Sequence, residues 1–155
     1  MKLSDHFTSE EFLPKEVHDW CVKKGYNPQW YINEYAVKFL EWLKTQTGDA
    51  SITINSWAFK GNRNWSGLRT WLFRWGGNFF ETWGDNLSQH RYKSAYDIVV
   101  ANYTPVQIVD IIKKNWDFIH KEFHLTTVEN PDKTPTWTHL DWRWTGFYYL
   151  LIVNP

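Results

Sequence analysis

The sequence predicts an α+β domain in which N-terminal helices pack on an antiparallel sheet formed mainly by later strands. Three observations carry this prediction. Apolar residues repeat at helical spacing between residues 27 and 48, residues 51–56 alternate as in a strand, and the chain after residue 123 holds three more strand-like segments. A length of 155 residues fits one domain with a core of ordinary size, so we expect residues 1–155 to form a single domain.

Two helices are expected before residue 50. Thr8 and Glu11 have the spacing of a capping box, which predicts a helix that starts there and breaks near Pro14. The pair at residues 27–28, Asn followed by Pro, is typical of a helix start. The apolar spacing then predicts one continuous amphipathic helix from that pair to Gly48, with one face packed on the sheet.

The middle of the chain predicts two strands, an irregular segment and another helix. Residues 51–56 and 94–101 are rich in β-branched residues, as strands are. Residues 58–87 between them are rich in Gly, Asn and Trp without clean periodicity, and a long irregular segment in a small domain is more often functional than accidental. Thr104 and Pro105 cap a predicted helix that continues through Ile119.

The last part of the chain predicts three successive strands. They cover residues 124–129, 136–144 and 147–153. The Pro-rich turn 130–135 would join the first two strands as a hairpin, and the pair at residues 145–146, Thr followed by Gly, would join the last two.

Composition excludes some classes of function. Lys plus Arg and Asp plus Glu both number 17, so we expect no bulk attraction to nucleic acid or to an anionic membrane. Cys21 is the single cysteine and cannot form an internal disulfide, which agrees with a reducing compartment. The sequence shows neither a membrane span nor an apolar export signal at its start, so we expect synthesis in the cytoplasm. The 12 tryptophans serve either as core and surface residues or as platforms for sugars.

A zinc site of hydrolase type needs about three protein ligands and one open position. His90 and Asp97 supply two candidate ligands. Strand alternation puts Trp137, His139 and Asp141 on one face, and pairing of that strand with 94–101 would bring His139 to His90 and Asp97. Spacing alone leaves open that these histidines are simply surface or core residues. We assign the remaining four histidines to that second class: His6, His18, His120 and His124.

Four segments resemble one known family. "SQHRYKSAYDI" is similar to the Ser-x-His-x-x-Gly-x-Ala-x-Asp motif of the zinc D-Ala-D-Ala carboxypeptidase and L-alanyl-D-glutamate endopeptidase family, whose fold is shared with the hedgehog signalling domain. "TWTHLDWR" resembles that family's second motif, Trp-x-His followed by an apolar residue and Asp. "LSDHFTSEEFL" and "ITINSW...SGLR" resemble its N-terminal motif and the strand and arginine-bearing loop of its phage-type members. The four occur in the family's order over nearly the whole chain.

The resemblance implies roles for individual residues. His90, Asp97 and His139 would be the zinc ligands, and Asp141 would orient one of them. Arg69 matches the arginine that approaches the substrate carboxylate or carbonyl oxygen, although a solvated loop arginine is an alternative. The remaining substrate-binding candidates are Ser88, which matches the motif serine, and Trp137.

The sequence departs from the family pattern at two places. Lys93 stands where the first motif has glycine, so a backbone position that can have positive φ in relatives must tolerate a side chain. Thr136 and Trp137 stand where many members carry the general base before the second histidine. Glu129, on the expected partner strand, is our first candidate for the base and Asp141 the second; a strand-end glutamate facing water is the alternative reading of Glu129.

The resemblance implies a zinc-dependent peptidase that cleaves a stem-peptide or cross-bridge bond of bacterial peptidoglycan, as a carboxypeptidase or an endopeptidase. A phage or prophage product is expected, made without a signal peptide and acting on the cell wall either as an endolysin released at lysis or as part of the phage particle. The alternative is a non-catalytic structural or binding protein of the virion that retains the metallopeptidase fold. A carbohydrate-binding module that uses its tryptophans would leave the ligand set unexplained.

Overall fold

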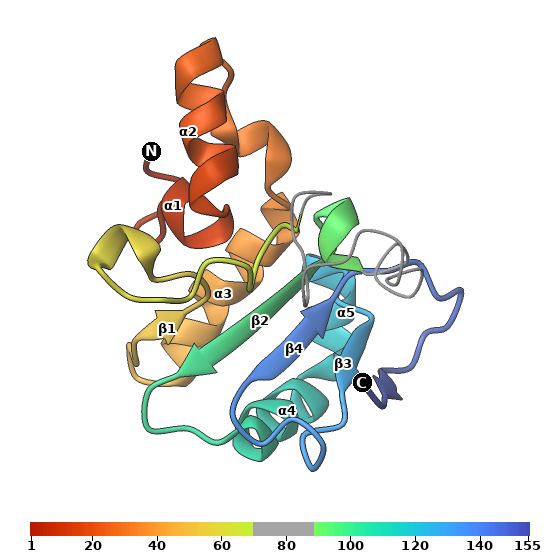
Figure 1. Ribbon diagram of the computed structural model, residues 1–155. Helices are drawn as coiled ribbons and strands as arrows, with labels where there is room; N and C mark the ends of the chain where they lie inside the picture. The colour runs from red at the N-terminus through yellow and green to blue at the C-terminus, as the bar shows by residue number, and fades with distance from the viewer. Residues whose placement is uncertain (70–88) are drawn as a thin grey trace.

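The computed structural model describes residues 1–69 and 89–155 and shows an α+β fold with a five-stranded mixed sheet (Figure 1). The first half of the chain contains α1 (Ser9–Phe12), α2 (Lys15–Lys24), the 3-10 turn η1 (Pro28–Tyr31), α3 (Glu34–Gln46), β1 (Ile52–Thr53) and η2 (Trp57–Phe59). The second half contains η4 (Gln89–Tyr92), β2 (Ala95–Val100), α4 (Pro105–Lys114), α5 (Trp116–Phe123), β3 (Thr127–Glu129), β4 (Thr138–Asp141) and β5 (Leu151–Val153).

The N-terminal helices follow their capping signals. The capping box of Thr8 and Glu11 starts α1, and Pro14 separates α1 from α2, as expected. The prediction of one helix from residue 27 to Gly48 is wrong. The Asn27 side chain does cap a helical turn, but that turn is η1, and the backbone then becomes extended. Asn33 accepts a hydrogen bond from the Tyr35 amide and starts α3 as a separate helix. Asn27 and Asn33 each cap the start of a helical element, so the segment forms two elements instead of one.

The predicted helix from Thr104 to Ile119 is also divided. Thr104 caps α4 in a capping box with Gln107, as the sequence indicates. Asn115 leaves helical geometry, with φ −116 and ψ 22, and α5 starts directly after it. Its side-chain amide donates to the Ile111 carbonyl four residues earlier. This local hydrogen bond competes with the helical pattern, as asparagine side chains commonly do.

The sheet has the strand order β1-β2-β4-β3-β5. The pairs β1 with β2, β2 with β4, and β3 with β4 are antiparallel. The predicted hairpin between the strands at 124–129 and 136–144 is therefore present, in shorter form. The pairing of β2 with β4 places Asp97 directly opposite His139.

The predicted hairpin across residues 145–146 is wrong, and the expected antiparallel sheet is mixed because one of its four strand pairs is parallel. β4 already has β2 on one edge and β3 on the other, so it has no free edge for β5. The intervening chain crosses toward α5, where Trp116 donates its indole N–H to the Tyr148 carbonyl. β5 then pairs with the outer edge of β3 in parallel.

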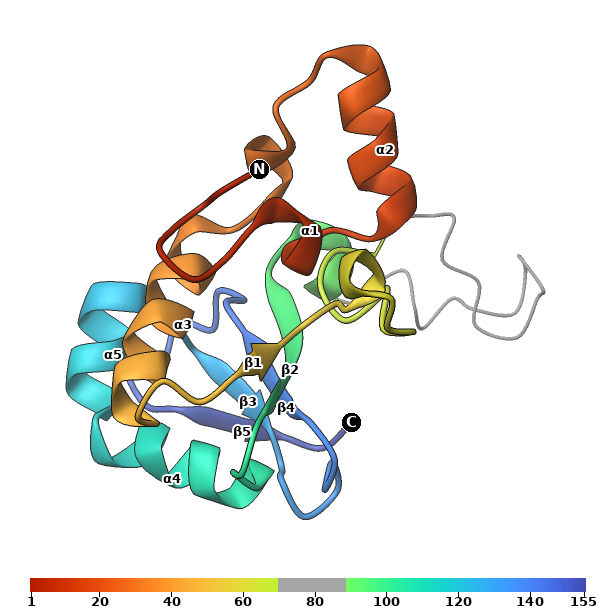
Figure 2. The ribbon, with the colours of Figure 1, turned by 90° about the vertical axis from the view of Figure 1, so that its left-hand side faces the viewer.

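The two faces of the sheet have different environments. α3, α4 and α5 lie on one face (Figure 2). Alternate strand residues belong to the buried core with those helices, among them Tyr96, Ile98, Val128 and Leu140. Their neighbours Asp97, Glu129 and His139 therefore project from the opposite face. Among the described helices, none is long and apolar enough to cross a membrane.

At Gly67 the loop backbone lies very close to the backbone at the end of α1. A Cβ atom built at Gly67 would lie 2.0 Å from the Phe12 carbonyl oxygen, which also accepts a hydrogen bond from Leu68 N. We expect Gly67→Ala to lower the free energy of unfolding by about 1–3 kcal/mol, because the loop must move away from α1. Chemical denaturation of this variant and of Ser66→Ala measures the effect. Equal stability of the two variants would contradict the close-approach explanation.

Candidate metal centre

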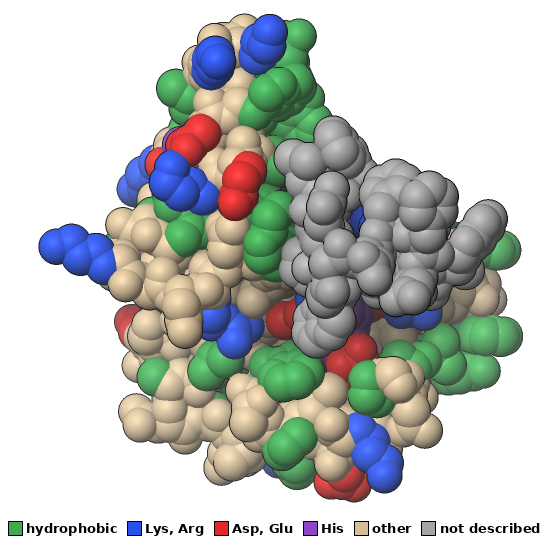
Figure 3. All heavy atoms as spheres, viewed as in Figure 1, with side chains coloured by type: hydrophobic (Ala, Val, Ile, Leu, Met, Phe, Trp, Pro, Cys, Tyr) green, Lys and Arg blue, Asp and Glu red, His purple; other side chains and the backbone are tan. Residues whose placement is uncertain are grey.

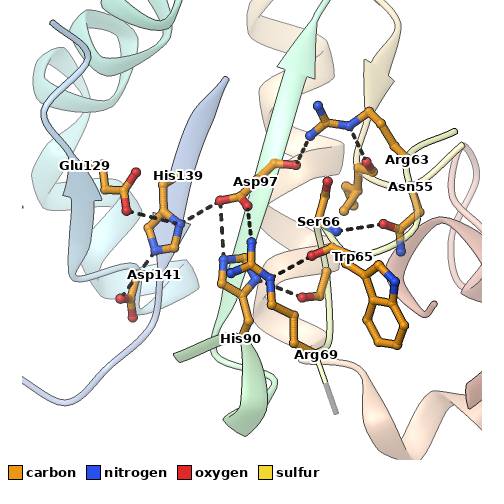
Figure 4. Close-up of polar contacts among 12 residues, drawn as sticks. Asn55, Arg63, Trp65, Ser66, Arg69, His90, Asp97, Glu129, His139 and Asp141 are labelled. Carbon is orange, nitrogen blue, oxygen red and sulfur yellow. Dashed lines mark hydrogen bonds and ion pairs between the residues drawn. The ribbon is translucent and has the colours of Figure 1, made fainter. Parts of the chain in front are cut away.

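Three buried side chains converge on the sheet face opposite the helices. His90 from η4, Asp97 from β2 and His139 from β4 each offer a ligand atom, and these atoms all lie within 4.8 Å of one another (Figure 4). Two imidazoles and one carboxylate form a donor set suited to zinc and to related divalent ions. The residues therefore fit a metal ion.

Asp97 lies at the middle of this cluster. Its Oδ1 is 2.7 Å from His139 Nδ1 and 3.4 Å from His90 Nε2. Its Oδ2 accepts a hydrogen bond of 2.9 Å from Arg69 Nη2. The two carboxylate oxygens are thus divided, one facing the histidines and the other facing the arginine.

The ring of His90 is held by the loop before it. His90 Nδ1 lies 2.8 Å from the Gly67 carbonyl oxygen, which can only accept, so Nδ1 carries the hydrogen. Nε2 is then the ring nitrogen that faces Asp97 Oδ1. An outer hydrogen bond that fixes the tautomer is a common support for a metal-binding histidine. The Arg69 amide donates to the His90 carbonyl and ties the same two segments together.

His139 is oriented from both sides. Its Nδ1 faces Asp97, and its Nε2 lies 3.7 Å from Asp141 Oδ2. Asp141 is fully buried and is itself held by Arg143, whose backbone N–H and Nε donate to the two carboxylate oxygens at 2.7 and 2.6 Å. Asp141 thus lies where it can orient His139.

Glu129 lies on β3 beside the cluster. Its Oε1 is 3.9 Å from His139 Nδ1. It faces a pocket of about 360 Å³ that also includes the three candidate ligands. The other residues of the pocket wall are Arg69, Gln89, Trp137, Arg143, Val153, Asn154 and Pro155. Asp141 does not line this pocket, so Glu129 is the carboxylate best placed to meet a ligand there.

Burial and hydrogen bonding determine the charges of the metal-free centre. Burial opposes ionisation of Asp97, but hydrogen bonds from His139 and His90 outweigh it and hold the pKa of the carboxyl far below its usual range. Burial likewise opposes protonation of His139, but its hydrogen bonds to Asp141 and Asp97 raise the pKa to about 9. Burial raises the pKa of Glu129. A proton on His139 therefore occupies the position that a metal ion would take.

Lys93 has the backbone conformation that a glycine adopts easily. Its φ is 54°, in the left-handed region. Its ammonium donates a hydrogen bond of 2.8 Å to the Trp30 carbonyl. The turn after η4 thus forms with a lysine at this position. Ser88, the other expected residue of this motif, lies outside the described residues.

The remaining histidines lie elsewhere, as expected. His6 and His18 contact Glu41 and Glu10, His120 stacks on Trp116, and His124 contacts Tyr35.

Sequence reasoning missed two supports of the centre, the Gly67 carbonyl and Arg143. Strand alternation placed Arg143 on the side of Asp141, two residues away, so its part in the centre was open to prediction. The contact between Gly67 and His90 joins residues 23 apart in sequence and has no local signal.

Comparisons of the chain with protein-family models, curated proteins and solved structures found no significant match.

The pH dependence of stability should change sign when a metal binds. In the metal-free protein, the contribution of His139 is complete below its ordinary pKa of 6.5 and is lost as pH rises through about 9. The contribution of Asp97 is present above its ordinary pKa of 3.8 and is lost at lower pH. In the metal-free protein, we therefore expect Asp97 and His139 together to stabilise the fold most between about pH 3.8 and pH 6.5.

Metal ligation requires neutral imidazole, so stabilisation by the metal should increase with pH. Thermal unfolding between about pH 5 and pH 9, with chelator and with zinc, tests the difference. His139→Gln is the control for groups elsewhere. In the presence of chelator, the wild type should lose its stability advantage over His139→Gln as pH rises from neutral to alkaline. If that advantage grew instead, the assignment of the proton to His139 would be wrong.

Proposed function

We propose that the protein is a zinc-dependent peptidase of bacterial peptidoglycan, with a fold of the hedgehog and D-Ala-D-Ala carboxypeptidase type. The observation that carries the proposal is the register of β2 and β4, which brings Asp97 opposite His139 and, with His90, gathers the motif residues of the resemblance in one buried cluster. A chance likeness of short motifs gives no reason for such convergence.

His90, Asp97 and His139 would hold the metal, through Nε2, Oδ1 and Nδ1 respectively, the atoms that face one another. Bound zinc supplies Lewis acidity, which polarises a carbonyl group and makes water a stronger nucleophile at neutral pH. The outer contacts of these ligands with Gly67, Arg69 and Asp141 would keep them in place when substrate enters.

Glu129 would act as the general base. It lies beside His139, is half-buried, and has a pKa raised by burial, which strengthens a carboxylate as a proton acceptor. It would take a proton from the attacking water and deliver it to the leaving amine. Asp141 would serve to orient His139, since Arg143 already binds both of its oxygens.

Arg69 and Trp137 would contact the substrate at the pocket wall. Arg69 holds Asp97 through Nη2 and the Trp65 carbonyl through Nε, which fixes its guanidinium at the edge of the pocket. Its positive charge there would favour a substrate carboxylate or the negative charge that develops on a carbonyl oxygen. Trp137 is 37% exposed and offers an aromatic surface to the peptide.

The substrate would be a stem or cross-bridge peptide with a D-configured or γ-linked residue beside the cleaved bond. This part of the proposal is supported by the resemblance of the motifs, and the assignment to a phage or prophage by the segments that resemble phage-type members. A virion protein that binds zinc without cleaving peptide is the second candidate, favoured by Lys93 in place of the motif glycine.

Metal content and wall digestion, measured together, test the proposal. We expect one zinc per chain and cleavage at a defined peptide bond, both lost in His139→Ala because two ligands cannot complete the site. His6→Ala, which changes an exposed histidine outside the cluster, is the matched control. Elemental analysis and mass spectrometry of peptidoglycan fragments give the two readouts. Zinc without cleavage would select the non-catalytic candidate, and absence of bound metal would reject both.

Replacement of the proposed base should separate catalysis from metal binding. We expect Glu129→Gln to retain zinc and to lower kcat about 100- to 10,000-fold, the usual contribution of general acid–base catalysis. Glu122→Gln, at an exposed position of α5, should retain full activity. Turnover of a soluble stem-peptide fragment measures both variants. An unchanged kcat in Glu129→Gln would exclude this residue as the base.

A further inference from the structure

A second and larger hollow lies outside the candidate metal centre. Its volume is about 980 Å³, and its wall combines η1, the first turns of α3 and the residues that follow His90. None of the residues that line it also lines the pocket of the metal centre. We call it the aromatic groove; the lining residues used below are Gln29, Trp30, Asn33, Tyr92 and Lys93, and the charged residues Glu34, Lys38 and Glu41.

Large aromatic side chains are exposed at the aromatic groove. Trp30 is 63% exposed and Tyr92 57% exposed. Trp30 also belongs to a chain of ring contacts that runs through Tyr26 to Trp20, and hydrophobic side chains gather at the surface beside α2 in Figure 3. Exposed aromatic rings held by neighbouring rings form a firm surface for a flat apolar ligand face.

The polar lining of the aromatic groove is rich in amides and its charges balance. Gln29 and Asn33 contribute side-chain amides. The charged lining residues comprise two lysines and two glutamates: Lys38, Lys93, Glu34 and Glu41. Each has a partner within the protein, since Lys38 pairs with Glu34, Lys93 donates to the Trp30 carbonyl, and Glu41 binds His6. The surface therefore favours an uncharged ligand with apolar faces and hydrogen-bonding edges, which is the chemistry of a sugar.

The 3-10 turn η4 contributes residues to both the aromatic groove and the pocket of the metal centre. Within η4, Gln89 and His90 line the pocket of the metal centre, whereas Tyr92 lines the aromatic groove. The hydrogen bond from Lys93, the residue after η4, to the Trp30 carbonyl joins this turn to η1.

Tyr96 adds two hydrogen bonds between the same parts of the chain. Its buried hydroxyl accepts from the Asn33 amide and donates to the Lys93 carbonyl, and the next residue along β2 is Asp97. A ligand in the aromatic groove would thus lie against the elements that hold two of the candidate metal ligands.

We propose that the aromatic groove binds the glycan strand of peptidoglycan, a polymer of N-acetylated hexosamines, while a stem peptide enters the metal centre. This inference rests on the proposed function and names a second contact of the same substrate. Trp30 and Tyr92 stack on sugar rings, and the amides of Gln29 and Asn33 hydrogen-bond to hydroxyl and acetamido groups. Lys93, at the motif glycine position, keeps Trp30 in place.

Binding of peptide-free glycan tests this site apart from catalysis. The probes are a soluble hexamer of N-acetylglucosamine and glycan strands stripped of stem peptides, titrated into wild type by calorimetry. We expect Trp30→Ala and Tyr92→Ala each to weaken binding of the stripped strands about tenfold, the upper range for one aromatic contact. Trp144→Ala, which removes a 92% exposed tryptophan outside the groove lining, should bind as wild type does. Circular dichroism verifies that each variant is folded.

Cleavage assays separate this site from the peptidase. We expect Trp30→Ala to cleave a soluble stem-peptide fragment at the wild-type rate and intact peptidoglycan more slowly. Wild type that binds neither glycan, or Trp30→Ala that binds as tightly as wild type, would overturn the groove assignment even if peptide cleavage is observed. Binding of stripped strands that depends on Trp30, without cleavage of any substrate, would retain glycan binding at the groove and reject the peptidase. Equal binding of the hexamer and the stripped strands would assign recognition to the N-acetylhexosamine unit alone.

Discussion

The buried carboxylate of Asp97 is the feature on which the candidate metal centre depends. A charge removed from water is costly unless it is paired and hydrogen-bonded, and Asp97 is surrounded by His90, His139 and Arg69. The backbone of Asp97 also makes hydrogen bonds to the loop at residues 63–69. The amide donates to the Ser66 carbonyl, and the carbonyl accepts from Arg63, which also donates to the Ile54 carbonyl. One residue of β2 thus fixes the loop at residues 63–69, which has little regular structure of its own.

The short-range features of the fold could be predicted from the sequence because they depend on neighbouring residues. The capping box at Thr8, the break at Pro14 and the start of α4 at Thr104 are such features. The approach of His139 to Asp97 was also open to prediction, since alternation on β4 leaves few choices of facing residue. The parallel pairing of β5 was not, because it depends on both edges of β4 being occupied, a property of the assembled sheet.

The departure at Lys93 shows how a local conflict is resolved by a distant contact. A lysine with positive φ is strained relative to glycine. Its carbonyl accepts from the nearby Tyr96 hydroxyl, and its ammonium donates to the Trp30 carbonyl, 63 residues away in sequence. Sequence reasoning could therefore identify the unusual residue, but the contact that accommodates it appears only in the folded chain.

The parallel pairing of β5 with β3 directs the chain toward the metal centre. β5 runs alongside Thr127 to Glu129, so the residues that follow Val153 arrive beside the candidate base, where Asn154 and Pro155 form part of the pocket wall. Anything joined to Pro155, such as a purification tag or a fused partner, would begin at the rim of that pocket. A tag attached near Met1, which lies beside α1 and away from the pocket wall, would leave the rim of the pocket unchanged (Figure 1).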